Sequence, residues 1–271
     1  MKKAACLVLS MISLSTYAQK MEGVLTYTQK VDLKSRFQNM DPAMQARMPE
    51  NITRQYQLAF TPQEALYEPA AVVDEGNGFG GGGPMGGPMR LGGASTVVYT
   101  QLSEKKRVES RDVFGEKYRV LDTLVNQRWK LGKETKTIKG FICQKASYTD
   151  TMRVQRMMVG PGGPPPGDSP AGENQKPMVR TVVAWYSSEI PVPIGPEKYS
   201  GLPGLILEVD VNNGESLYTV SEMEWRKPKS SELKAPKGGK AVTETEVREI
   251  MMKRMEEMRK NGGGMRMRPG N

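Results

Sequence analysis

The sequence has 271 residues, of which 25% are charged, and it carries a formal net charge of +9 with two cysteines and no histidine. This length suits one domain of moderate size with tails, or at most two domains. The lack of histidine excludes Ser-His-Asp and Cys-His catalysis, imidazole metal sites and a histidine pH switch. The basic charge favours acidic partners, glycans or anionic lipid headgroups, and no nucleic-acid-binding signature occurs.

The first eighteen residues have the pattern of a cleaved export signal. Met1-Lys2-Lys3 is a basic start, residues 4–14 are apolar, and Thr16-Tyr17-Ala18 resembles a cleavage site. The apolar stretch is too short to span a bilayer, and no later stretch is apolar enough to do so. We therefore expect a protein that is not membrane-spanning and is exported to the periplasm, with secretion or association with the outer membrane as alternatives.

Removal of the signal would take Cys6 with it and leave Cys143 as the only cysteine. An intramolecular disulfide is then excluded. A lone thiol in an export compartment suggests a reactive or intermolecular role. The alternative is a small buried hydrophobic residue on a strand, and the apolar neighbours Phe141, Ile142 and Ala146 favour it.

Strands are predicted from the start of the mature chain. In residues 22–31, Leu25, Tyr27 and Val31 share one face, and residues 52–60 alternate between apolar and polar side chains. Asp41-Pro42 predicts the start of a short helix that runs to about residue 48. Further strands are predicted at residues 64–68, 95–102, 106–112, 116–124, 129–131, 141–149, 178–187, 205–211 and 215–225.

The predicted strands follow one another at short, nearly regular intervals with turn residues between them. Gly115, Asn126 and Gly132 mark such turns, and Asn212-Asn213-Gly214 is a hairpin signal. This spacing is typical of an antiparallel meander. Glycine- and proline-rich insertions at about residues 74–93 and 160–177 lack the side chains needed for a core, and we expect both to be disordered.

The C-terminal region is predicted to lie outside the β-rich domain of residues 19–225. Residues 226–242 form a basic linker, and an amphipathic helix follows over residues 243–261. Thr243 and Glu246 form its capping box. The helix carries an apolar stripe of Val247, Ile250, Met251, Met255 and Met258. We expect it to pack on the sheet, although a partner or membrane surface would also suit it. Residues 262–271 are a disordered basic tail.

Roughly nine or ten antiparallel strands and one helix predict a mainly β fold. The meander would form an open half-barrel or a barrel-like curled sheet, which resembles the half-barrel of periplasmic lipoprotein carriers in fold alone. Such a sheet has an apolar concave face suited to a lipid or acyl chain. Trp185, Tyr186 and Tyr199 are candidate lining residues, with ordinary core positions as the alternative.

Gly201-Leu202-Pro203-Gly204-Leu205-Ile206 joins two of the predicted strands. Within Leu202-Pro203-Gly204-Leu205, proline at the second position of the turn and glycine at the third predict a type II turn in which Gly204 has positive φ. The hexapeptide resembles the signature of the GLPGLI family, secreted proteins of Gram-negative bacteria without an assigned function. Other landmarks of that resemblance are Trp129, residues 139–146, residues 184–186, Ile190-Pro191 and Gly195-Pro196. It covers about residues 20–225 and implies a β-rich envelope protein with no assigned catalytic residue.

These observations predict a non-catalytic envelope protein that binds an apolar ligand or an envelope protein, without a cofactor or metal. One alternative is Cu(I) binding by thioethers, because 17 of the 19 methionines remain after Met1 and Met11 are removed. Filling of cores and helix stripes explains methionine equally well. The other alternative is an exported hydrolase that uses two carboxylates, with Glu189, Glu197 and Glu208 near the central motif.

Overall fold

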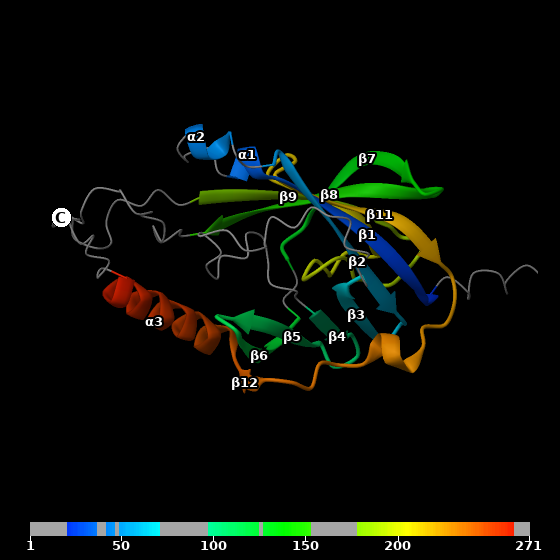
Figure 1. Cartoon of the computed structure of the whole chain (residues 1–271). Coiled ribbons are helices and arrows are strands. Elements are labelled where there is room, and N and C mark those ends of the chain that lie inside the picture. Colours follow the sequence, from blue (N-terminus) through cyan, green and yellow to red (C-terminus); the bar gives the residue numbers. More distant parts are fainter. Residues whose placement is uncertain are drawn as a thin grey trace, which may run out of the picture.

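The computed structural model describes residues 21–36, 42–46, 49–70, 97–124, 127–152 and 178–262 (Figure 1). The predicted export signal and both predicted insertions lie outside these residues, as do residues 263–271. Within the described part of the chain, twelve strands form one sheet.

The first half of the sheet runs outward from β1, consecutive strands pairing antiparallel. The elements in this half are β1 (Gly23–Asp32), α1 (Leu33–Arg36), α2 (Pro42–Gln45), β2 (Asn51–Phe60), β3 (Glu64–Pro69), β4 (Val97–Gln101), β5 (Lys106–Val113) and β6 (Glu116–Thr123). Helix α2 confirms a helix after Asp41-Pro42 and ends at Gln45, whereas residues 47–48 of the predicted helix lie outside the described residues. The predicted alternation of β2 is confirmed, because Tyr56, Leu58 and Phe60 are all buried.

The chain then crosses to the opposite edge and returns toward β1. Its elements are β7 (Lys130–Ile138), β8 (Phe141–Met152), β9 (Met178–Ser187), β10 (Leu205–Val211) and β11 (Ser216–Glu224). β11 pairs antiparallel with β1, so two meanders meet in the middle of the sheet. The prediction for β7 was too short, because Gly132 lies within the strand, where the register with β8 shifts between Leu131 and Thr135.

Residues 226–242, predicted as a linker, carry structure of their own. They contain the short 3-10 helix η2 (Ser230–Leu233) and the strand β12 (Lys240–Val242), which pairs with β6 in parallel. Helix α3 (Glu244–Gly262) follows directly and extends past β6 (Figure 1). Its Val247 is buried with Tyr118, Val120 and Val242, which confirms the predicted packing of this helix on the sheet.

The sheet is curled and open, since β7 and β12 stand at opposite ends of the strand order. The mainly β fold, the open curled sheet and the C-terminal helix are therefore confirmed. Two-residue turns join neighbouring strands at Phe114-Gly115 and Lys139-Gly140, where both residues have positive φ, as a type I′ hairpin requires. Among the described helices, none combines the length and the apolar character that crossing a membrane demands.

Candidate functional site

The candidate site is built on residues 188–204, which connect β9 to β10 and which we call the plug segment. Ile190, Val192, Ile194 and Leu202 of this segment are 0–3% exposed and belong to the same core cluster as Tyr27, Leu58 and Tyr67 of the sheet. The apolar inner face of the curled sheet is therefore covered by the chain's own residues.

Backbone hydrogen bonds fix the shape of the plug segment. Gly201 N donates to Pro193 O at 3.0 Å, Leu205 N donates to Ile190 O at 2.9 Å, and Ile206 N donates to Ile194 O at 2.9 Å. The segment before β7 holds it from outside. Trp129 Nε1 donates to Ser200 O, and Gln127 Nε2 donates to Lys198 O, both at 2.9 Å. A segment satisfied in this way presents its side chains from a fixed frame.

The central motif does not form the predicted turn. Gly204 lies outside the positive-φ region, and Gly201 has φ +84° instead. Gly204 N donates to Leu202 O at 2.8 Å, a hydrogen bond that closes a three-residue γ-turn around Pro203. Glycine is required at 204 for space, because a Cβ there would lie 2.1 Å from Ser187 O.

The plug segment directs the carboxylate of Glu197 toward the sheet. Glu197 has φ +52°, an uncommon conformation for a residue with a side chain. Tyr218 Oη donates to Glu197 Oε1 at 2.6 Å, and Gln29 Nε2 donates to Tyr218 Oη at 2.8 Å. Removal from water raises the pKa of Glu197, although the bond from Tyr218 opposes that shift.

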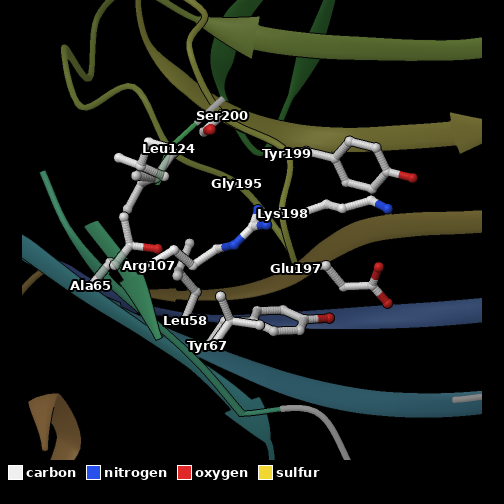
Figure 2. Close-up of a pocket in the computed structure, with 13 residues that line it drawn as sticks. Leu58, Ala65, Tyr67, Arg107, Leu124, Gly195, Glu197, Lys198, Tyr199 and Ser200 are labelled. Atoms are coloured by element: carbon white, nitrogen blue, oxygen red, sulfur yellow. The ribbon is translucent and has the colours of Figure 1, made fainter. Parts of the chain in front are cut away.

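Glu197 lines a small pocket between the plug segment and strands β2 to β5. In Figure 2, Tyr67, Glu197, Lys198 and Tyr199 extend in the same direction from the two walls. The room for a water-sized sphere is about 10 Å³, close to what one water molecule needs. Polar side chains supply much of the lining, which includes Tyr67, Thr100, Arg107, Glu197, Lys198 and Ser200.

Several donors at this pocket have no acceptor. Tyr67 is 1% exposed, and its hydroxyl has no hydrogen-bond partner within the described residues. The same holds there for the buried Nε of Arg107, whose Nη2 pairs with Asp122 at 2.5 Å. Lys198 is an exposed residue, yet dehydration of its ammonium and the nearby charge of Arg180 lower its pKa. The buried donors, the Tyr67 hydroxyl and the Arg107 Nε, are costly unless an acceptor reaches them.

The three predicted lining residues are not brought together. Tyr199 lines the pocket, whereas Tyr186 is a core residue whose hydroxyl donates to Gln144 Oε1 at 2.8 Å. Trp185 precedes Tyr186 in β9, and its side chain therefore projects from the opposite face of the sheet. The Nζ of Lys136 stands 4.4 Å from the centre of its ring.

The three carboxylates named for a hydrolase are also separate. Glu208 pairs with Lys136 at 2.6 Å, and Glu189 accepts from the backbone N of Ile142 at 3.0 Å. Glu197 alone of the three lines the pocket. Sequence reasoning missed Tyr67, Arg107 and Tyr218, which look like ordinary alternating strand residues and gave no local signal.

The structure also places Cys143 and some of the methionines named in the predictions. Cys143 is fully buried, and burial raises its pKa to about 11, as expected of a small hydrophobic residue and not of a reactive thiol. Met251 packs beside Val247 in the cluster under α3, and Met252 is exposed. Among the described residues, no group of three or more acidic or cysteine side chains is placed to hold a metal ion.

One crystal form of PNGF-II is similar to this chain in fold. The structure of PNGF-II in the P21 space group has a TM-score of 0.51 and 14% identity, and its C2 form has a TM-score of 0.49 and 14% identity. Both matches cover 86% of this chain and 33% of the PNGF-II chain, so this chain spans about a third of that protein. LprF from Mycobacterium bovis has a TM-score of 0.26 at 10% identity, over 82% of this chain and 92% of its own.

Sequence similarity to known proteins covers a smaller part of the chain. No curated protein matches this chain. Residues 129–208 match a family described as "Protein of unknown function (Porph_ging)". That stretch contains Trp129, Cys143 and the whole plug segment.

Proposed function

We propose that this chain is an exported, non-catalytic binding protein of the periplasm. It recognises a segment of another envelope protein at the pocket between the plug segment and strands β2 to β5. The observation that carries the proposal is the presence of unpartnered donors, Tyr67 Oη and Arg107 Nε, in a pocket whose wall is fixed by backbone hydrogen bonds. Fixed polar groups of this kind give a binding site its specificity.

A protein partner suits this geometry better than an apolar ligand. The apolar inner face of the sheet packs against Ile190, Val192, Ile194 and Leu202. The pocket itself admits about one water molecule, whereas an acyl chain needs a cavity of several hundred Å³. A partner surface would reach the pocket with one side chain and make its other contacts around the mouth.

Binding also suits the carboxylates better than hydrolysis does. A hydrolase of the predicted kind needs two carboxyl groups on opposite sides of one bond. Glu189 and Glu208 are engaged with Ile142 and Lys136 instead. The raised pKa of Glu197 also supports binding, because this carboxylate can take up a proton when a negatively charged group enters the pocket.

Photo-crosslinking in the native cell tests the proposal. A benzoylphenylalanine at Lys198 places the reactive group at the pocket mouth, and the same residue at the exposed Lys234 is the control. We expect a discrete protein adduct from position 198 in the periplasmic fraction, and none from position 234. Equal labelling from both positions, or no adduct from 198, contradicts the proposal. Sequencing the N-terminus of the fractionated protein tests export, with Gln19 as the expected first residue.

A further inference from the structure

The pocket lining combines two buried hydrogen-bond donors that have no acceptor within the described residues and one exposed ammonium. The buried donors are Tyr67 Oη from β3 and Arg107 Nε from β5. The ammonium is that of Lys198 from the plug segment. In the described part of the chain, Lys198 Nζ has no ion pair or hydrogen bond, although the charges of Glu197 and Glu109 act on it. Figure 2 shows the three side chains among those that line the pocket. The two buried donors among them are costly unless an acceptor reaches them.

The carboxylate in the pocket lining, that of Glu197, already has a hydrogen bond at its Oε1. Glu197 accepts a hydrogen bond from Tyr218, which in turn accepts one from Gln29. Arg107 is largely buried, with 13% of its side chain exposed, and its pairing with Asp122 uses Nη2 and leaves Nε free to donate. The missing group is therefore an acceptor that also suits two cations, which describes an anionic oxygen.

Size narrows the choice among anions. A space of about 10 Å³ accepts one oxygen atom. A carboxylate at the tip of a side chain can place one oxygen among the three donors while its other oxygen stays at the mouth. The tetrahedral oxygens of a phosphate need more room. The formal net charge of +9 over the whole chain also favours an acidic partner.

Resting on the proposed function, we infer that the partner is an acidic peptide segment that inserts one Asp or Glu carboxylate between Lys198, Arg107 and Tyr67. Lys198 and Arg107 supply charge-assisted hydrogen bonds, and the Tyr67 hydroxyl gains the partner that it lacks. The carboxylate of Glu197 tunes the site, because its negative charge opposes the incoming anion until it is protonated.

A titration with blocked pentapeptides tests this inference on the full mature chain. The probes are acetyl-Gly-Gly-Glu-Gly-Gly-amide and the same peptide with Gln at the centre. The indole N–H resonance of Trp129 is followed by NMR, because that group donates to Ser200 at the pocket. We expect saturable shifts with the Glu peptide and affinity weaker by about tenfold or more with the Gln peptide. Equal affinity for both peptides, or tighter binding of inorganic phosphate, overturns the inference.

Variants assign the effect to the pocket. Lys198→Met is expected to weaken binding of the Glu peptide by about tenfold or more. Lys234→Met removes the same charge from an exposed residue that does not line the pocket, and it should leave the affinity unchanged. Tyr67→Phe deletes the unpartnered donor and is expected to weaken binding about threefold to tenfold. Its melting temperature should equal or exceed that of the wild type, which separates loss of binding from loss of folding. Equal losses in the two lysine variants, or no loss in Tyr67→Phe, overturn the inference.

The two proposals fail in different ways. A partner adduct at position 198 without binding of the Glu peptide would leave the proposed function standing and remove the acidic partner. The absence of both the adduct and the peptide binding would remove both.

Discussion

Tyr27 on β1 donates a hydrogen bond of 2.6 Å from its hydroxyl to the carbonyl oxygen of Ile206, which lies 179 residues later at the end of the central motif. Both side chains are fully buried. The pairing of β10 with β9 changes register between Ile206 and Glu208, so the bond satisfies a carbonyl where the ladder is irregular. It ties the end of the plug segment to the middle of the sheet.

Replacing Tyr27 with Phe should therefore destabilise the protein more than the loss of one oxygen atom suggests. The Ile206 carbonyl would remain buried without this donor, which costs about 1–3 kcal/mol in the free energy of unfolding. Urea denaturation measures the change. Tyr67→Phe is the matched control, because the Tyr67 hydroxyl has no partner within the described residues. Equal losses in the two variants would show that the hydrogen bond contributes nothing.

Gly204→Ala tests why the central motif has glycine at its fourth position. The added Cβ would lie 2.1 Å from Ser187 O and 2.6 Å from Ser187 C, and the backbone of β9 would have to move. We expect a loss of about 1–3 kcal/mol or more in unfolding free energy, as in other overpacked sites.

Two further glycines distinguish the effect of a steric clash at Cβ from the effect of backbone strain at positive φ. Gly214 has φ +95° with no atom near its missing Cβ, so Gly214→Ala should cost about 1–2 kcal/mol through strain alone. Gly238 has neither constraint, and Gly238→Ala should change stability by less than about 0.5 kcal/mol. If Gly204→Ala behaves like Gly238→Ala in thermal denaturation, the close approach to Ser187 has no energetic importance.

Cys143 should be inert in the folded protein. Its pKa of about 11 leaves the thiol protonated at pH 8, and the side chain is fully buried, so the thiolate that reacts with alkylating agents is absent and out of reach. Iodoacetamide followed by mass spectrometry should show no adduct under native conditions and complete modification in 6 M guanidinium chloride (the expected concentration for unfolding is about 5 M or less). Rapid native labelling would instead support a reactive thiol.

Local patterns were sufficient for most strands. The alternation of Tyr56, Leu58 and Phe60 identified the buried face of β2, because a strand buried on one side has a period of two. Gly132 was misread as a turn, since glycine also occurs at bulges within strands. The neighbours β1 and β11 could not be deduced, because their pairing joins residues such as Val31 and Ser216, which no local pattern relates.

The pocket was beyond sequence reasoning for the same reason. Tyr67, Arg107 and Glu197 come from three distant segments, and each one alone has an ordinary explanation. At Gly204 the pattern Leu-Pro-Gly-Leu matched a type II turn, but the approach of Ser187 decided the need for glycine. A sequence pattern does not distinguish a glycine required for φ from one required for space.

The raised pKa of Glu197 predicts how stability depends on pH. The folded protein binds this proton more tightly than the unfolded chain, whose ordinary value is 4.5. The stabilising effect of the proton is complete below pH 4.5 and is lost as the pH rises through the folded-state pKa. Glu197→Gln is neutral at every pH and still offers Tyr218 an acceptor. Its melting temperature should match that of the wild type near pH 4 and exceed it near pH 7.5.

Glu232→Gln should change the melting temperature at neutral pH in the opposite direction, and it serves as the comparison. Hydrogen bonds from Arg226 lower the pKa of Glu232 to about 2, so its contribution is present at neutral pH and is lost on acidification. That variant should melt below the wild type near pH 7.5, with a difference that shrinks toward pH 2. Because the two carboxylates respond in opposite directions, a general effect of removing one negative charge from a basic protein cannot produce both results. If Glu197→Gln also melts below the wild type at pH 7.5, the carboxylate at the pocket is stabilised by its surroundings, and the assignment of a raised pKa is wrong.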